Sequence, residues 1–380
     1  MIDTAIFCDA LIQQRVDFCA GVPDSLLRHF CAGISAKLPS RRHVVAANEG
    51  AAIALAAGHY LATGRPGLVY MQNSGLGNAV NPLVSLADPE VYGVPMVLLI
   101  GWRGEPGVKD EPQHAKQGAI TPALCEALGM PYRMLPRDTQ PAVQLVAATI
   151  EASLEANRPV ALIVHADSFT EFPAATAASP YPLNREAAVI AIASVLPSNA
   201  VVVSTTGHIS RELFEYRAAA GAGHERDFLT VGSMGHASQI ALGIALAQPT
   251  RPIVCLDGDG AVLMHMGALA ILGTSGANNL LHVVLNNGAH DSVGGQPTAG
   301  FKVDLVHVAK ACGYRTASQP AGPKDIRTAL GNLSWTSGPH FMEIRVAKGA
   351  RKNLGRPTTQ PADNKKAFME FLRSDESAGP

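Results

Sequence analysis

The sequence predicts an α/β protein built from two doubly wound parallel-sheet domains. In both halves of the chain, short apolar runs rich in Val, Leu and Ile alternate with helical patterns. Each run is too short for a buried helix and is apolar on both faces, as is typical of parallel strands covered by helices on both sides. Residues 171–184, rich in Pro, Ala and Ser and without periodicity, indicate a linker between the halves. A chain of 380 residues is long enough for two such domains.

The first predicted domain covers residues 1–170. Its expected strands are 18–23, 43–48, 67–72, 95–101 and 159–165. Between the second and third of these, the Ala-rich stretch 49–64 has the pattern of a helix that begins at Glu49. Strands separated by helices in this way form a parallel sheet with helical layers.

The second predicted domain covers residues 185–380 and repeats this architecture. Its expected strands are 200–207, 251–260, 280–287 and 340–347. The tail from about residue 348 is polar and basic, and it ends in a short helical pattern at 364–374. We therefore expect two similar α/β domains and no third.

Composition excludes several classes of protein. The chain is 47% apolar and 16% charged, which suits folded cores and not a disordered chain. Its 30 basic and 31 acidic residues give a net charge of −1, which provides no field for a nucleic acid backbone. An uninterrupted run of 18 apolar residues does not occur, so we expect no membrane span, and the N-terminal residues show no basic leader of a signal peptide. Six scattered cysteines without a CxxC pair favour reduced thiols in a cytoplasmic protein.

Two polar motifs end neighbouring predicted strands in the second domain. Gly258-Asp259-Gly260 ends one strand, and Asn286-Asn287 ends the next. Because ligands bind at the carboxyl ends of strands in open α/β sheets, the two motifs should face one site. Each motif alone could be a tight Gly-Asp-Gly or Asn-Gly turn, but the pair at this spacing favours a binding site.

The residue types in these motifs suit Mg²⁺ and a diphosphate. A hard divalent cation takes oxygen ligands, and it usually shares them with substrate phosphates. We expect a carboxylate oxygen from Asp259, an amide oxygen from Asn287 and a backbone carbonyl from Ala289. Gly258 and Gly260 carry no side chains, which lets the backbone approach a diphosphate closely.

The spacing of these motifs resembles that of the thiamin diphosphate enzymes. The resemblance implies a glutamate in the other domain that touches N1′ of the cofactor's aminopyrimidine, and Asn48-Glu49-Gly50-Ala51 matches the family's pattern. Glu49 would be the catalytic residue that exchanges a proton with N1′. The alternative is a carboxylate stabilised by the dipole at a helix N-terminus.

The resemblance also implies further cofactor contacts in the second domain. They would come from Thr206, Gly207 and Gly232, and from Met234, the apolar residue that would support the bent cofactor. Met234 could equally be a core methionine. The family's active sites lie between subunits, so the resemblance implies a homo-oligomer, at least a dimer.

Chain length and local strings narrow the resemblance. The larger decarboxylases and synthases of the family carry a middle domain that this chain lacks. The strings GVPDSLL, GWRGEPGVKDEPQHAKQG, STTGHISRELFE and NNGAHDSVGGQPT are similar to those of the compact phosphonopyruvate and sulfopyruvate decarboxylases, up to about residue 347. The fused chain with SREL after the TTG turn looks more like the phosphonopyruvate enzymes. The implied reaction is decarboxylation of 3-phosphonopyruvate to phosphonoacetaldehyde and CO₂, in phosphonate biosynthesis.

A basic loop follows the strand at 95–101. Arg103, Lys109, His114 and Lys116 fall within fourteen residues, and together they could bind a phosphonate. The alternative is a solvated surface loop, since acidic residues are interspersed there. By the resemblance, His114 would face the substrate, and Asp24 would handle protons near the reacting carbon.

Two positions depart from the family pattern, and other functions stay open. Val293 stands where pyruvate decarboxylases place a glutamate, so Asp24, His114 or a water would have to donate the product-side proton. His208 stands where a lysine is expected.

Alternative functions are decarboxylation of sulfopyruvate, other 2-oxo acid decarboxylation or carboligation, and a non-catalytic regulatory subunit. Such a subunit would be expected to lose Glu49, Asp259 or Asn287, and all three are present.

Overall fold

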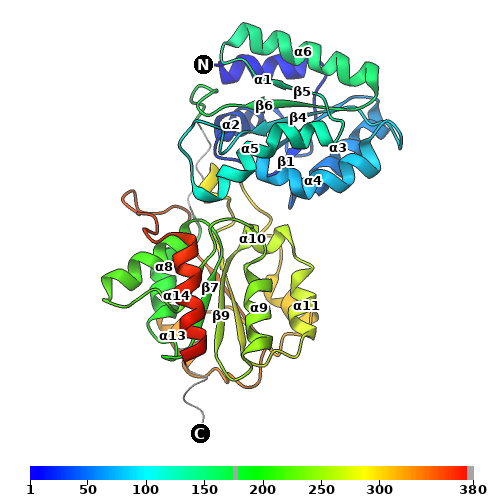
Figure 1. The fold of residues 1–380 in the computed structure, drawn as a ribbon. Coiled ribbons are helices and arrows are strands. Elements are labelled where there is room, and N and C mark those ends of the chain that lie inside the picture. Colours follow the sequence, from blue (N-terminus) through cyan, green and yellow to red (C-terminus); the bar gives the residue numbers. More distant parts are fainter. Residues whose placement is uncertain (174–178, 375–380) are drawn as a thin grey trace. The chain divides into compact units, whose positions relative to one another are not determined.

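The computed structural model describes residues 1–173 and 179–374. Part of the expected linker, residues 174–178, and the last six residues lie outside the described residues. The chain divides into two compact units, Met1–Thr176 with His290–Gln296, and Ala177–Ala289 with Pro297–Pro380 (Figure 1). Each unit is built around one parallel sheet with helices on both faces.

The first unit contains a six-stranded sheet in the order β2-β1-β3-β4-β6-β5, and its recorded strand pairings are all parallel. The strands are β1 Cys19–Gly21, β2 His43–Val45, β3 Gly67–Gln72, β4 Met96–Gly101, β5 Tyr132–Met134 and β6 Pro159–Val164. The helices are α1 Thr4–Gln13, α2 Arg28–Lys37, α3 Glu49–Thr63, α4 Leu76–Pro82, α5 Pro112–Ala127 and α6 Thr139–Ala156. A 3₁₀ turn, Asn73–Gly75, joins β3 to α4, and a π-helical turn, Leu83–Ala87, follows α4.

The second unit contains another six-stranded parallel sheet, in the order β11-β12-β10-β9-β7-β8. Its strands are β7 Val201–Ser204, β8 Asp227–Leu229, β9 Ile253–Gly258, β10 Leu280–Asn286, β11 Thr316–Ser318 and β12 His340–Arg345. Its helices are α7 Arg185–Ala193, α8 His208–Ala219, α9 Ala237–Ala247, α10 Asp259–Met264, α11 Ala268–Thr274, α12 Leu305–Ala311, α13 Pro323–Gly331 and α14 Pro361–Ser374.

The two sheets have the same strand order. Read from β8, the second sheet runs β8-β7-β9-β10-β12-β11, which matches β2-β1-β3-β4-β6-β5 of the first. In the first sheet β2 and β3 lie on opposite sides of β1. In the second sheet β8 and β9 lie on opposite sides of β7. This reversal creates a crevice beyond the carboxyl ends of β1 and β3, and another beyond those of β7 and β9, where ligands bind in folds of this kind.

All nine strands expected from the sequence are present, and the prediction of two doubly wound sheets is confirmed. The sequence reading missed β5, β8 and β11. Each of these is a three-residue strand at the edge of its sheet. The single helical pattern expected after the GDG motif is two helices, because α10 ends at Met264 and α11 begins at Ala268.

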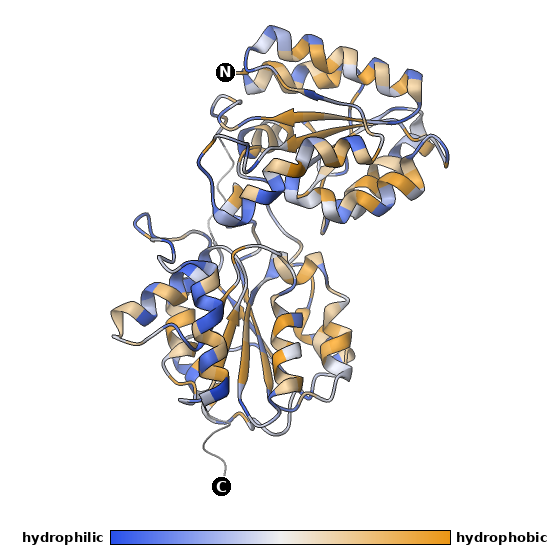
Figure 2. Cartoon of the chain, in the orientation of Figure 1, coloured by the Kyte–Doolittle hydropathy of each residue, from blue (hydrophilic) through white to orange (hydrophobic). Residues whose placement is uncertain are grey.

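Each sheet separates two apolar cores. Along β3, Leu68 and Tyr70 belong to the core on one face, and Val69 and Met71 belong to the core on the other. The central strands are therefore mainly apolar, whereas many helices carry one polar and one apolar side (Figure 2). The six cysteines are free thiols, and five of them are buried.

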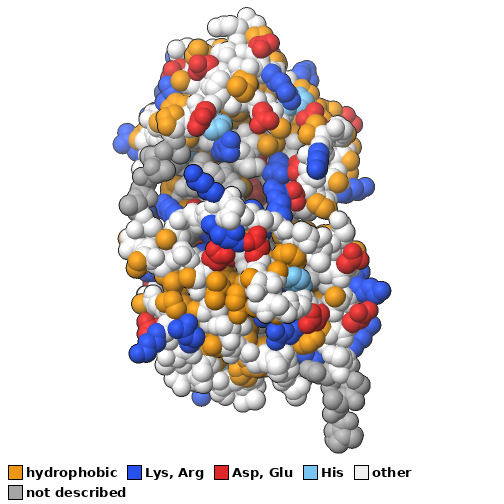
Figure 3. Space-filling view, turned by 90° about the vertical axis from the view of Figure 1, so that its left-hand side faces the viewer, with side chains coloured by type: hydrophobic (Ala, Val, Ile, Leu, Met, Phe, Trp, Pro, Cys, Tyr) orange, Lys and Arg blue, Asp and Glu red, His pale blue; other side chains and the backbone are white. Residues whose placement is uncertain are grey.

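Basic and acidic side chains are interspersed on the face shown in Figure 3. Among the described residues, no helix has the length and apolar character needed to cross a membrane.

Candidate active site

Glu49 is the first residue of α3, directly after the loop that follows β2. Asn48 caps this helix, since its side-chain oxygen accepts a hydrogen bond of 2.8 Å from the backbone N–H of Ala51. The Glu49 side chain is only 5% exposed, and Asn78 of α4 donates a hydrogen bond of 2.8 Å to its Oε2. The helix start and Asn78 thus hold one carboxylate oxygen in place.

Gly75 lets the Glu49 carboxylate lie against the turn that follows β3. A Cβ atom at Gly75 would lie 2.4 Å from Oε1 and 2.5 Å from Cγ of Glu49. Contacts this short between heavy atoms are not tolerated, so any side chain here would displace the carboxylate. The sequence reading did not identify Gly75 or Asn78.

We predict that Gly75→Ala lowers kcat by about 10- to 100-fold while the protein stays folded, because a displaced catalytic group loses its alignment. Gly77→Ala is the matched control, because a Cβ at Gly77 of the adjacent helix would meet no atom within 4 Å. Steady-state kinetics and thermal melting of both variants test the prediction. Equal activity in the two variants would show that the position of Glu49 does not depend on Gly75.

Asp24 lies in the loop after β1 and is completely buried. Its Oδ2 accepts a hydrogen bond of 3.3 Å from the backbone N–H of Leu26, and its Oδ1 has no hydrogen-bond partner among the described residues. Burial raises the pKa of Asp24 to about 6, although the charge of Arg103 opposes this shift. A carboxyl group with this pKa can hold a proton near neutral pH, as a proton-transferring group requires.

The predicted basic loop after β4 is internally paired. Arg103 donates from Nε and Nη2 to Asp110, and from Nη1 to the Ser25 hydroxyl at 2.8 Å. His114, in α5, lies with its Nδ1 2.9 Å from the same Asp110 carboxylate. The Arg103 guanidinium is therefore mainly occupied by protein groups, and only its remaining N–H groups could reach a substrate.

A groove of about 550 Å³ opens beside this loop in the first unit. It is lined by Ser25, Arg28, His29, Arg103 and Lys109, among other residues. Lys109 is exposed and forms no ion pair with a described residue. Lys116 is also exposed, but it lies on α5 and does not line the groove. Of the four predicted substrate-binding residues, Arg103 and Lys109 thus line the groove. His114 and Lys116 do not line it, and His114 contacts Asp110.

Asp259 begins α10 at the end of β9 and is only 2% exposed. The Thr298 hydroxyl donates to its Oδ2, and the backbone N–H of Asn287 lies 3.4 Å from its Oδ1. Asn287 accepts a hydrogen bond of 3.0 Å from the backbone N–H of Ala289 on its side-chain oxygen. The structure therefore brings together the three predicted metal ligands, Asp259, Asn287 and Ala289.

The environment of Asp259 fits a cation. No lysine or arginine among the described residues forms an ion pair with it, and burial raises its pKa to about 6. Burial of an ionised carboxylate without a counter-charge lowers the stability of the folded protein, and a bound Mg²⁺ would supply the missing charge. The carboxylate, amide and carbonyl oxygens are the donors that Mg²⁺ prefers.

The two asparagines of the second motif have different roles. Asn286 donates to the Gly300 carbonyl at 2.9 Å and to Glu343 at 2.7 Å, and it accepts from the Gly288 N–H. It therefore shapes the loop, while Asn287 lies beside Asp259. A Cβ at Gly300 would lie 2.5 Å from Oδ2 of Asp259, so this glycine is required for the close approach.

The remaining predicted cofactor contacts follow β7 and β8. The Thr206 hydroxyl donates to the Val231 carbonyl at 2.9 Å and so joins the two loops. Gly207 has a φ of 101°, which only glycine adopts easily, and it precedes the first residue of α8. Gly232 and the half-buried Met234 lie in the loop after β8. These residues follow β7 and β8 as Asp24 and Glu49 follow β1 and β2, the equivalent strands of the other sheet.

Comparisons with known proteins agree with this geometry. Residues 4–124 match the thiamine pyrophosphate enzyme N-terminal TPP binding domain, and residues 205–344 match the C-terminal TPP binding domain. The chain is 38% identical to the phosphonopyruvate decarboxylase of Streptomyces viridochromogenes, over 98% of this chain and 95% of that one. The chain belongs to the thiamine pyrophosphate enzymes.

Other members of this family are similar over nearly the whole chain. The phosphonopyruvate decarboxylase of Streptomyces hygroscopicus is 37% identical over 98% of this chain and 94% of that one. The sulfopyruvate decarboxylase of Methanosarcina acetivorans is 26% identical over 95% of each chain. Glu49 falls within the matched N-terminal domain, and Asp259 and Asn287 fall within the matched C-terminal domain.

Proposed function

We propose that this thiamine pyrophosphate enzyme decarboxylates 3-phosphonopyruvate to phosphonoacetaldehyde and CO₂. The observation that carries the proposal is the groove beside the loop that contains Asp24. Its lining mixes acidic residues with the cations Arg28, Arg103 and Lys109, and Arg103 and Lys109 could face an anionic C3 substituent. In pyruvate C3 is a methyl group, which would form no favourable contact with these charged side chains. The names of the two Streptomyces relatives support the same substrate, while a sulfonate remains the alternative anion.

The second unit would hold the diphosphate end of the cofactor. Asp259, Asn287 and the Ala289 carbonyl would bind Mg²⁺, and the Gly258–Gly260 backbone would approach the diphosphate. Gly207 and the start of α8 would lie near the same anion, where helix N–H groups favour negative charge. Met234 and Gly232 would contact the cofactor from the loop after β8.

The first unit would move protons. Glu49, held by Asn78, would exchange a proton with N1′ of the aminopyrimidine. Bound thiamin diphosphate supplies the carbon that adds to the keto group and the ring that accepts the electrons released with CO₂. Replacing the lost carboxylate by hydrogen then requires one proton, and Asp24, whose pKa burial raises to about 6, is the group of this unit suited to deliver it.

The proposal is tested by assaying the full chain, with thiamin diphosphate and Mg²⁺, on phosphonopyruvate, sulfopyruvate and pyruvate. We expect phosphonoacetaldehyde and CO₂ in equal amounts, and a higher kcat/KM for phosphonopyruvate than for the other two acids. A higher kcat/KM for sulfopyruvate would replace the proposed substrate. Absence of turnover on all three would remove the decarboxylase assignment for these acids.

Lys109 should distinguish phosphonopyruvate from pyruvate. We expect Lys109→Met to raise KM for phosphonopyruvate by about 10-fold, because one hydrogen bond between charged groups is lost, and to change KM for pyruvate little. Lys116→Met is the matched control, since Lys116 is exposed nearby but does not line the groove. If both substrates or both variants respond equally, the groove does not bind the phosphonate.

We propose further that the enzyme is a homo-oligomer, at least a dimer, with active sites completed across subunits. Helix α3, which begins at Glu49, presents apolar surface: Leu61 is 73% exposed, and Leu55 is also exposed. Tyr92, beyond the π-helical turn that follows α4, is 72% exposed. Large exposed apolar side chains gathered on neighbouring elements are typical of protein interfaces.

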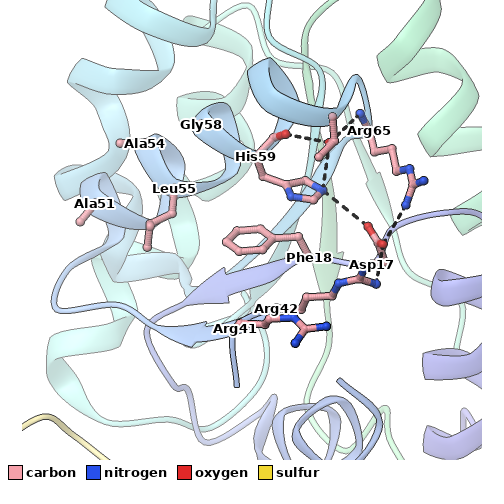
Figure 4. Close-up of a pocket in the computed structure, with 11 residues that line it drawn as sticks. Asp17, Phe18, Arg41, Arg42, Ala51, Ala54, Leu55, Gly58, His59 and Arg65 are labelled. Carbon is pink, nitrogen blue, oxygen red and sulfur yellow. Dashed lines mark hydrogen bonds and ion pairs between the residues drawn. The ribbon is translucent and has the colours of Figure 1, made fainter. Parts of the chain in front are cut away.

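A groove of about 960 Å³ runs along the same helix (Figure 4). Its apolar floor comes from Ala51, Ala54, Leu55 and Gly58. Its polar end is a cluster in which Asp17 binds Arg42 at 2.7 Å and Arg65 at 2.9 Å. An apolar floor beside a charged rim is the usual composition of an interface between folded proteins, and we expect a second copy of the chain to cover it.

Complementation tests the shared site. We expect Glu49→Gln chains and Asp259→Ala chains to be nearly inactive alone and to regain part of the activity when mixed. A mixed dimer with shared sites contains one site with both defects and one with neither. If mixed dimers are shown to form and activity does not return, each active site is made by a single chain.

A further inference from the structure

Asp110 is the centre of the loop that connects β4 to α5. Its carboxylate accepts hydrogen bonds from Nε and Nη2 of Arg103 at 2.8 and 2.5 Å, and from the backbone N–H groups of Gly104 and Glu111 at 2.8 and 2.7 Å. Its Oδ1 also lies 2.9 Å from Nδ1 of His114, one helical turn later. Five donors therefore converge on one half-buried carboxylate.

This arrangement dictates which nitrogen of His114 carries the proton. Burial opposes ionisation of Asp110, but the hydrogen bonds from Arg103, His114 and Gly104 hold its pKa well below the usual range. An ionised carboxylate can only accept hydrogen bonds, so Nδ1 of His114 must be protonated. In the neutral imidazole, Nε2 then presents a lone pair, and no described residue is hydrogen-bonded to it.

The surroundings of His114 favour its neutral form. Burial lowers its pKa, the hydrogen bond and charge of Asp110 raise it, and the charge of Arg103 lowers it, with a net shift downward. Asp110 and Arg103 are the charged groups that act on the ring among the described residues. The proton position in the neutral ring, and not only its charge, is therefore a property that the loop controls.

The loop itself is tightly fixed to α5 and to β3. A Cβ at Gly104 would lie 1.9 Å from the His114 carbonyl oxygen, and a Cβ at Gly118 would lie 1.6 Å from the Gly104 carbonyl oxygen. The buried Asn73 side chain binds both the N–H and the carbonyl of Arg103, at 3.1 and 2.8 Å. This packing leaves Asp110 little freedom to move away from His114.

We propose that Asp110 is a positioning residue of the active site: it orients His114 as the Nδ1–H tautomer and so leaves Nε2 as the acceptor nitrogen of the ring. The assignment rests on the proposed decarboxylase function, in which His114 faces the substrate. The same carboxylate holds Arg103 at the groove that it lines together with Lys109, so one residue would align both the proton-transfer group and the anion site.

The first test measures the ring directly. Nitrogen-15 NMR of the full chain distinguishes protonated from unprotonated ring nitrogens, and loss of one signal in His114→Asn identifies His114 among the 13 histidines. We expect Nδ1–H in the wild type and Nε2–H in Asp110→Ala, because free imidazole prefers that tautomer in water. An unchanged tautomer in Asp110→Ala would overturn the proposal. This readout does not depend on turnover, so it stands apart from failure of the proposed function.

The second test is a double-mutant cycle on kcat with phosphonopyruvate. We expect Asp110→Ala to lower kcat by about 10- to 100-fold in the wild-type background. In a His114→Ala background the same change should lower kcat less than about 3-fold, because Asp110 acts through His114. Equal losses in both backgrounds would show that Asp110 only anchors the loop. Thermal melting of each variant checks that the fold is retained, and Asp110→Asn, which keeps an acceptor oxygen, should lose less activity than Asp110→Ala.

Discussion

Glu49→Gln should leave a folded protein that binds thiamin diphosphate and turns over at least about 100-fold more slowly. Glutamine has nearly the same size as glutamate, so α3 and its Asn48 cap should be unaffected. The amide cannot exchange a proton with N1′ of the cofactor. Its NH₂ group could also face the donating amide of Asn78, whose hydrogen bond to Oε2 holds the native carboxylate.

Two measurements separate this effect from a loss of binding. Cofactor affinity should change little, whereas exchange of the cofactor's C2 proton for deuterium should slow together with kcat. Glu126→Gln is a suitable control, because Glu126 is an exposed glutamate of the same unit that accepts a hydrogen bond from the Tyr132 hydroxyl and does not line the proposed substrate groove. Rapid C2 exchange in Glu49→Gln would remove Glu49 from the role of proton-exchanging residue.

Hydropathy was sufficient to predict the central strands, but of the four strands at the edges of the sheets it predicted only β2. β3, β4, β9 and β10 are apolar on both faces because helices cover both sides, and such runs are visible in a sequence. β5, β8 and β11 are three residues long, and β11 is largely exposed. The exposed edge strands β5 and β11 bury little and are held mainly by backbone hydrogen bonds to their neighbours, so their side chains carry little signal. β8 is largely buried, but three residues are too few to show a hydropathy pattern.

The candidate active-site residues divide in a similar way. Glu49, Asp259 and Asn287 stand in local motifs, because each must lie where a strand ends. Their partners are distant in the sequence: Asn78 lies 29 residues from Glu49, and Thr298 lies 39 residues from Asp259. Single asparagines and threonines in loops have many roles, so only the folded topology shows that these side chains meet the motif residues.

The basic loop shows how composition alone can mislead. Its acidic residues seemed to indicate ordinary mixed surface charge, while its basic residues were taken together as an anion site. In the structure Asp110 occupies most of the Arg103 guanidinium and binds His114. The loop is thus not a cluster of free donors: Arg103 is largely paired within it, and Lys109 is the cation of the loop that remains available at the groove.

Asp259→Ala should abolish cofactor binding at low Mg²⁺ and weaken it by about 100-fold at saturating Mg²⁺, because the loss of one ligand lowers metal affinity and leaves the diphosphate charge less compensated. Asn287→Ala should have the same effect in weaker form. Titration of thiamin diphosphate at several Mg²⁺ concentrations measures both. The difference between the wild-type and variant affinities should shrink to this limit as Mg²⁺ rises if the metal site is weakened and not destroyed.

Stability measurements show whether such a loss comes from the metal site or from unfolding. Asp259 is buried without a cationic partner, so its removal should leave the melting temperature of the cofactor-free protein unchanged or higher. Asp304→Ala is the contrasting control: Asp304 caps α12 by accepting a hydrogen bond from the His307 N–H, and its loss should lower the melting temperature without altering the Mg²⁺ dependence. If Asp259→Ala bound thiamin diphosphate with wild-type affinity and wild-type Mg²⁺ dependence, the oxygen ligands of the metal would have to lie elsewhere in the second unit.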